Sequence, residues 1–343
     1  MQQFPALDAA HREALLAPRA GRVDLVIDTD AGNEIDDQFT VAWALRRSDR
    51  LRLLGLLACP FGITPELLAS GTMLAELDAR RVARRLAAMG ACPDAIPRFD
   101  AGDGMRVAVR ELETLVALAG ANCPVHPGST RYLGAFDTPP ESPAVRFLIE
   151  SAHAPREGPL YVAAIGCATN VAAALLCDPT LVGRIVVVWV AAYPSFWPHR
   201  NASYNLAQDV RAAQVLLDSG VPLVYVPGYY VAEELRSTRE ETARFLAGRG
   251  PLADYLDALH EAHARKGSGA VQSKVLWDLA ALAWILEPAW FTTHVVPTPR
   301  LTEDLRWIDA ESSRPLMLEA VDLDRDAIFA DFYGCFGSRE ADG

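Results

Sequence analysis

The residues most suggestive of chemistry are five acids within ten positions, in the run Asp28-Thr29-Asp30-Ala31-Gly32-Asn33-Glu34-Ile35-Asp36-Asp37. Carboxylates this close repel one another unless a cation balances them. Hard oxygen ligands favour Ca²⁺ or Mg²⁺, and several carboxylates with a carbonyl suit the more flexible shell of Ca²⁺. The spacing does not match the calcium loop of an EF-hand.

An alternative interpretation of this run is an acidic helix start, in which Asp36 and Asp37 complement the helix dipole. The additional Asp28-Thr29-Asp30 directly after an apolar stretch favours the metal site. A second rival is a haloacid-dehalogenase-type phosphatase using Mg²⁺, because VIDTDAG looks like its nucleophile loop. That loop requires Thr or Val where this chain has Gly32.

The elements that must position these acids alternate along the chain. Apolar runs of strand length predict buried strands, and longer amphipathic stretches predict helices. The expected strands are 23–28, 51–58, 160–166, 184–192 and 221–227, and the expected helices are 36–47, 144–153, 170–178, 209–220 and 274–288. This alternation predicts an α/β fold with a doubly wound, mainly parallel open sheet flanked by helices.

A sheet of this kind binds ligands beyond the carboxyl ends of its strands. Polar residues follow the strands expected at 23–28, 160–166 and 184–192, so they should meet at one edge. We expect one domain over 1–343, with an N-terminal extension at 1–22. An Ala- and Arg-rich insertion at 62–104 is expected to be helical and then loop-like, either structural or a lid or dimer element.

The composition excludes some classes of function. A net charge of −12 opposes binding to nucleic acid, which depends on Lys and Arg. The six cysteines are widely spaced, which favours a reduced cytoplasmic location. The sequence has no signal-peptide core and no apolar stretch of about 20 residues, so we expect no membrane insertion.

Four motifs together resemble the inosine-uridine-preferring nucleoside hydrolase family, the calcium-dependent nucleoside N-ribohydrolases. DTDAGNEIDDQ resembles the family's DxDPGxDD motif, in the branch that lengthens the loop to DTDxxNExDDQ. AIGCATNVA resembles the segment ending in TN(I/V)A, ASYNLAQD resembles EFNxxxD, and KVLWDLA resembles the late HDxLA motif. The resemblance extends from about 23 to 336 and implies hydrolysis of the N-glycosidic bond of a ribonucleoside or related N-riboside.

The resemblance also implies roles for individual residues. Asp30 would bind Ca²⁺ and deprotonate a calcium-bound water as the general base. The remaining calcium ligands would be Asp37, the Ile165 carbonyl and Asp278. The substrate would contact Asp36, Asn33, Ser203, Asn205 and Trp277, with Asp28 and Asn170 supporting the ligands from behind.

Two departures from the family pattern affect the expected activity. Ser203 stands where the family has a ribose-binding Glu, and Trp277 stands where purine-specific members can carry a protonating His. His199 is our first candidate for the acid that protonates the leaving base. The alternative is a nucleoside-binding homologue that has lost turnover. The expected partner is a small nucleoside, and the resemblance implies a homodimer or homotetramer.

Overall fold

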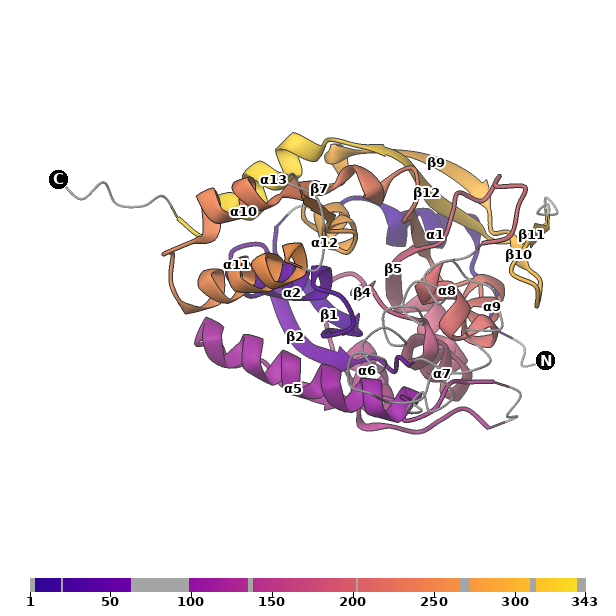
Figure 1. Cartoon of the computed structure of the whole chain (residues 1–343). Helices are drawn as coiled ribbons and strands as arrows, with labels where there is room; N and C mark the ends of the chain where they lie inside the picture. Colours follow the sequence, from indigo (N-terminus) through magenta and orange to yellow (C-terminus); the bar gives the residue numbers. More distant parts are fainter. Residues whose placement is uncertain are drawn as a thin grey trace, which may run out of the picture.

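The computed structural model describes residues 4–19, 21–62, 99–134, 138–201, 203–265, 272–308 and 313–337. Within this part of the chain the main feature is an eight-stranded sheet of order β3-β2-β1-β4-β5-β6-β12-β9 (Figure 1). All its neighbouring strands are parallel except β9, which pairs antiparallel with β12. The strands are β1 Val23–Thr29, β2 Leu51–Ala58, β3 Val125–Pro127, β4 Leu160–Ala164, β5 Ile185–Ala191, β6 Leu223–Pro227, β9 Phe291–Pro297 and β12 Leu316–Leu323.

Helices cover both faces of this sheet, as the apolar strands require. Within β1, Leu25 and Ile27 pack into one hydrophobic core and Val26 into the other. The first core contains residues of α2 Asp36–Arg46, α5 Ala101–Ala119, α11 Pro251–Ala264, α12 Leu279–Leu286 and α13 Arg325–Gly334. The second contains residues of α6 Pro143–His153, α7 Thr169–Cys177 and α9 Val210–Asp218. Figure 1 shows α2 and α11 on the side of the sheet away from α7 and α9.

The direction of winding reverses next to β1. The chain passes from β1 outward to β2 and β3, and then returns to β4 on the other side of β1. The loops that follow β1 and β4 therefore diverge, and a crevice opens between them at the carboxyl ends of these strands. The fold and the five expected strands are confirmed, with ends that differ by a few residues from the predicted ranges.

Two predictions about helices are wrong. The stretch 274–288 is not one helix, because Ser273–Val275 forms strand β8 and α12 begins only at Leu279. Residues 101–104 are not a loop: they form the first turn of α5, which starts with a capping box between Asp100 and Asp103. The helix expected earlier in the 62–104 insertion falls on residues 63–98, which lie outside the described residues.

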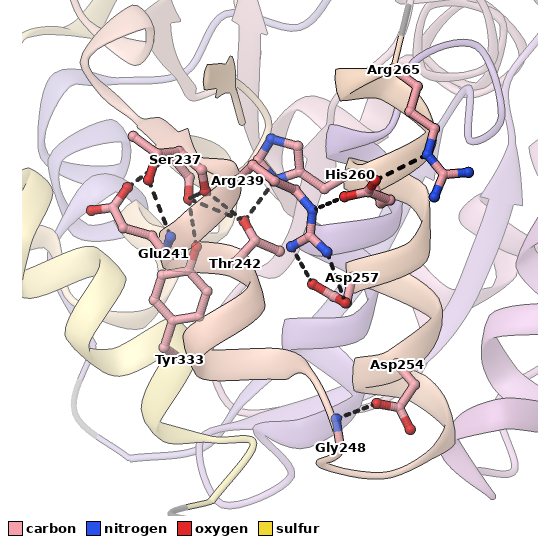
Figure 2. A network of polar contacts seen from close by, with 12 residues as sticks. Ser237, Arg239, Glu241, Thr242, Gly248, Asp254, Asp257, His260, Arg265 and Tyr333 are labelled. Atoms are coloured by element: carbon pink, nitrogen blue, oxygen red, sulfur yellow. Dashed lines mark hydrogen bonds and ion pairs between the residues drawn. The ribbon is translucent and has the colours of Figure 1, made fainter. Parts of the chain in front are cut away.

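Strand β8 pairs antiparallel with β7 Arg236–Thr238, and a polar network holds this two-stranded sheet in place (Figure 2). The Ser237 hydroxyl lies 2.7 Å from the Tyr333 hydroxyl of α13. Thr242, in α10 Arg239–Leu246, contacts His260 Nδ1 of α11 at 2.6 Å. Burial, and then the nearby Arg239, lowers the pKa of His260 to about 4, so this imidazole is neutral near pH 7. Residue 274, opposite Ser237, therefore has a fixed backbone position.

The N-terminal helix is packed against the body of the fold. Helix α1 Ala9–Leu16 buries Leu15, and the Arg12 guanidinium donates a 2.7 Å hydrogen bond to the Gly220 carbonyl. Among the helices that the structure describes, none combines the length and the apolar character needed to cross a membrane.

Candidate functional site

A cavity of about 510 Å³ opens in the crevice beside β1 and β4. This volume lies within the usual range for pockets that bind small molecules. Its wall contains nearly all the residues predicted from the sequence to form a site. These are Asp30, Asn33, Asp36, Asp37, Ile165, Ser203, Asn205, Trp277 and Asp278.

Three of the carboxylates in this cavity form a tight cluster. Asp36, Asp37 and Asp278 each offer an oxygen, and these oxygens all lie within 4.8 Å of one another. Asp36 and Asp37 form the first turn of α2, whereas Asp278 occupies the N-cap position of α12. The Asp278 side chain makes no capping hydrogen bond, although capping is the usual role of Asp at that position. Its carboxylate is therefore directed to the cavity and not to its own helix.

Burial and mutual repulsion make this cluster unfavourable without a cation. Burial, and then repulsion from neighbouring carboxylates, raises the pKa of Asp37 and of Asp278 well above the usual range. Burial also raises the pKa of Asp30, and repulsion from Asp36 adds to this shift. A cation relieves this cost, and a set of carboxylate oxygens suits a hard metal ion. The described residues thus fit a divalent metal.

Asp30 lies at the end of β1 and is held from two sides. The Asn33 amide donates to Asp30 Oδ2 at 3.0 Å, across the turn formed by Ala31 and Gly32. A Cβ atom at Gly166 would lie 3.0 Å from Asp30 Oδ1 and 3.1 Å from Cys59 Sγ. Only glycine fits comfortably here, so the loop after β4 approaches Asp30 closely. Asp30 does not belong to the 4.8 Å cluster, although it lines the same cavity.

Asp28 and Asn170 do not line the cavity and are joined to each other by a hydrogen bond. The Asn170 amide donates to Asp28 Oδ1 at 2.8 Å and to the Ala58 carbonyl at 3.3 Å, and its oxygen accepts from Ser129 N. Asp28 is fully buried, and burial raises its pKa to about 7. Asn170 therefore ties the ends of β1 and β2 to α7.

The carbonyl of Ile165 and the side chain of Asn205 are in direct contact. Asn205, in α8 Tyr204–Gln208, donates from Nδ2 to the Ile165 carbonyl at 2.9 Å and to the Val190 carbonyl at 3.2 Å. The Ser203 hydroxyl accepts a 2.9 Å hydrogen bond from Ala192 N. Ser203 is thus committed to the backbone after β5. Asp209, in the same motif, caps α9 and accepts from Leu133 N, so its carboxylate serves the fold.

Sequence reasoning did not single out Lys274, which lies beside the acidic cluster. Its ammonium contacts Glu34 Oε2 at 2.5 Å, Asp36 Oδ1 at 3.3 Å and the Val275 carbonyl at 2.8 Å. Burial lowers the pKa of Lys274, but Asp36 and Glu34 outweigh burial and raise it above the usual value. One signal was available, since Lys274 is one of two lysines in a chain with 32 Lys and Arg residues.

Aromatic residues form another part of the wall. Trp277 meets Tyr229 edge-to-face at 5.4 Å between ring centroids, and both line the cavity. Tyr229 stacks in turn on Tyr193 at 4.2 Å. His199 is exposed and meets Trp197 edge-to-face at 5.2 Å between ring centroids, outside the cavity wall. Among the described residues, the histidine that lines the cavity is His263, in the last turn of α11.

Comparison with known proteins agrees with this arrangement. Residues 25–329 match the family model described as inosine-uridine preferring nucleoside hydrolase. A pyrimidine-specific ribonucleoside hydrolase of Citrobacter koseri is 30% identical over 182 residues, which are 49% of this chain and 57% of that relative. The chain therefore matches a little over half the length of that curated relative.

Solved structures show the same fold. A plant nucleoside hydrolase has a TM-score of 0.65 at 19% identity, covering 92% of this chain and 98% of that one. A purine-preferring ribonucleoside hydrolase from Gardnerella vaginalis has a TM-score of 0.58 at 20% identity, covering 91% and 98%. Because the family model spans nearly the whole chain, this protein belongs to the inosine-uridine preferring nucleoside hydrolase family.

Proposed function

We propose that this protein hydrolyses the N-glycosidic bond of a ribonucleoside or a related N-riboside. The observation that carries the proposal is that Asp30, Asp37, Asp278 and Ile165 line one cavity with an aromatic wall. Family membership supports the same reaction. The names of relatives include pyrimidine-specific and purine-preferring enzymes, so the test uses both kinds of nucleobase.

The proposed metal is Ca²⁺, held by Asp30, Asp37, Asp278 and the Ile165 carbonyl. Carboxylate and carbonyl oxygens are the ligands that Ca²⁺ prefers. When bound, such an ion supplies positive charge that lowers the pKa of water and helps to orient the substrate. Asn205 supports the carbonyl ligand, since its Nδ2 donates to the Ile165 oxygen at 2.9 Å.

Asp30 is the proposed general base. It accepts a proton from the attacking water, and Asn33 holds its Oδ2 atom during this step. A general base must lie within hydrogen-bond reach of the proton that it takes, and Asp30 lines the cavity in which the attacking water would lie. As the N-glycosidic bond to the nucleobase breaks, positive charge develops on the sugar. The surrounding carboxylates stabilise this charge electrostatically.

The sugar is proposed to contact Asp36, Asn33, Ser203 and Asn205. Both amide protons of Asn205 are engaged by the Ile165 and Val190 carbonyls, so its oxygen is left as an acceptor for a hydroxyl group. Trp277 and Tyr229 offer ring surfaces to the leaving base. His199, expected from the sequence to protonate that base, and His263, in the cavity wall, are two candidates that a kinetic comparison can separate.

The test is incubation of the protein and Ca²⁺ with a panel of purine, pyrimidine and modified nucleosides, assaying released base and reducing sugar. Asp30→Asn should abolish release and weaken calcium binding, because it removes both a base and a charged ligand. Asp37→Ala and Asp278→Ala should chiefly lose the metal. Unchanged Ca²⁺ affinity in all three variants would exclude the proposed site.

The rival proposal is a nucleoside-binding protein without turnover. It is favoured by Ser203 and Trp277, which stand where the family has a ribose-binding Glu and can have a protonating His. In that case calorimetry would detect nucleoside binding while no base was released from any member of the panel. The proposed assembly is a homodimer or homotetramer, which light scattering of the purified protein can test.

A further inference from the structure

The Lys274 ammonium has three protons, and the structure provides three oxygens for them. Glu34 Oε2, Asp36 Oδ1 and the Val275 carbonyl lie at 2.5, 3.3 and 2.8 Å from Nζ. The Lys274 side chain is only 6% exposed, whereas that of Glu34 is 38% exposed. An ammonium with every proton engaged has none left for a substrate. Its contribution must therefore be made through the residues that it holds.

The contact between the Lys274 ammonium and Asp36 affects whether Asp36 can bind a metal ion. Its carboxylate lies within 4.8 Å of those of Asp37 and Asp278, so all three oxygens are close enough to share one metal ion. However, one oxygen of this carboxylate, Oδ1, is an acceptor for Lys274. A carboxylate oxygen that points its lone pairs at an ammonium is less available to a metal, and the positive charge of Lys274 further opposes a metal bound there.

We propose that Lys274 is a positioning residue that keeps Asp36 out of the metal shell, so that this carboxylate serves the sugar of the substrate. This inference rests on the proposed function for the identity of the ligand. The acidic residues are thereby divided between two cations. The metal takes Asp30, Asp37 and Asp278, while Lys274 takes Asp36 and Glu34.

The position of Lys274 is fixed from behind. Its backbone pairs with Ser237 in the two-stranded β7–β8 sheet, and Ser237 is anchored by the buried Tyr333 hydroxyl and by Thr242 (Figure 2). On the other side, Glu34 belongs to the loop between β1 and α2. Lys274 thus connects that loop to the strand preceding Asp278, and its ammonium is held beside Glu34 and Asp36.

The first experiment measures two affinities by calorimetry in Lys274→Met. One ligand is Ca²⁺. The other is formycin B, a ribose C-nucleoside whose carbon–carbon bond resists hydrolysis. Removing the ammonium frees Asp36 and removes a positive charge, so Ca²⁺ should bind about tenfold tighter. Formycin B, measured with Ca²⁺ saturating, should bind about tenfold weaker, because Asp36 is drawn to the metal and away from the sugar.

Arg265→Met is the matched control. It also removes one cation, but Arg265 is 76% exposed, pairs with Glu261 and does not line the cavity. Both affinities should stay within about twofold of the wild type, as expected for a screened surface charge. If Lys274→Met behaved like Arg265→Met for both ligands, Lys274 would have no positioning role.

A second variant keeps the proposal testable even if Lys274→Met does not fold. Asp36→Asn should leave Ca²⁺ affinity within about threefold of the wild type while weakening formycin B, whereas Asp37→Asn should lose Ca²⁺ by at least about 100-fold. If Asp36→Asn lost Ca²⁺ as severely as Asp37→Asn, Asp36 would be a metal ligand and the proposal would be overturned. These metal measurements need no turnover. A wild type that binds Ca²⁺ but releases no base would therefore refute the proposed function without deciding the role of Lys274.

Discussion

The hydroxyl of Thr29 donates a 2.5 Å hydrogen bond to Asp37 Oδ1. Thr29 is the last residue of β1 and Asp37 lies in the first turn of α2, so this contact ties the two ends of the acidic loop together. Asp37 also offers a carboxylate oxygen to the cluster with Asp36 and Asp278. The cluster is therefore built before any cation arrives, and the metal-free protein bears the cost of repulsion between its carboxylates.

This cost predicts a particular dependence of stability on pH. Burial and repulsion raise the pKa values of Asp30, Asp37 and Asp278 in the folded chain. The folded chain then binds protons more tightly than the unfolded chain, so stability falls as pH rises above the ordinary Asp pKa of about 4 and through the raised values. In EDTA, we expect the Tm to be lower at about pH 8 than at about pH 6.

Added Ca²⁺ should reverse this trend, because it neutralises the carboxylates in their charged form. The calcium-induced increase in Tm should be larger at the higher pH. Scanning calorimetry with EDTA or Ca²⁺ at the two pH values checks both statements. An increase in Tm that was equal at both pH values would mean that the metal binds away from these carboxylates.

A second prediction concerns Ser203, which supports the backbone. Ala192 has a positive φ of 54°, uncommon for a residue other than glycine, and its N–H donates to the Ser203 hydroxyl. Ser203→Ala leaves this buried N–H without its partner and should destabilise the fold by about 1–3 kcal/mol. Thermal denaturation is the measurement, and Ser203→Thr is the control that keeps the hydroxyl. Equal Tm values for the Ala and Thr variants would contradict this role.

The same contact changes what is expected of Ser203→Glu. A carboxylate at this position can accept a strong hydrogen bond from a sugar hydroxyl, so ribosides should bind tighter and the corresponding deoxy analogues should not. The Ala192 hydrogen bond is lost at the same time, so the Tm should fall. Binding and melting are measured on the same variant. Equal gains for ribosides and their deoxy counterparts would point to general electrostatics.

The third prediction concerns Trp277, whose indole lines the cavity and meets Tyr229 edge-to-face. Trp277→Phe keeps an aromatic surface and should retain much of the activity. Trp277→Ala loses it, and stacking on a base contributes about 1–3 kcal/mol, so KM should rise by about 5- to 150-fold. Steady-state kinetics with the best nucleoside of the panel measures KM for both variants. An Ala variant with unchanged KM would make Trp277 a packing residue only.

Much of the fold was predictable because its strands are buried on both faces. The runs that form β1, β2, β4, β5 and β6 are apolar along most of their length. Such continuous apolar runs can be recognised as strands from the sequence alone. Strand β9 differs, since several of its side chains are exposed and it pairs only with β12 at the edge of the sheet. Its pairing is set by register with β12, a later segment of the chain, and no pattern within β9 itself reveals that register.

The site was predictable where acidic residues were concentrated and unpredictable where one residue acts alone. Asp278, predicted from its motif as a metal ligand, lines the cavity, although the helix assigned to its neighbourhood was wrong. Lys274 carries no periodic signal, and only the pairing of β8 with β7 brings it next to Asp36. The same holds for His263, which is separated from the acidic loop by most of the chain and lies in an ordinary amphipathic helix.

The last prediction separates the two histidines as acids for the leaving base. His263 lines the cavity, whereas His199 is exposed and lies against Trp197 outside its wall. A general acid must lie within hydrogen-bond reach of the atom that it protonates, and its removal typically costs about 10²–10⁴-fold. We therefore expect His263→Ala to slow release of a poorly leaving purine more than His199→Ala does. With p-nitrophenyl riboside, whose leaving group needs no proton, both variants should stay close to the wild type. If His199→Ala alone slowed the purine nucleoside, His199 would be the general acid. If His263→Ala slowed both substrates equally, His263 would be a residue that positions the substrate.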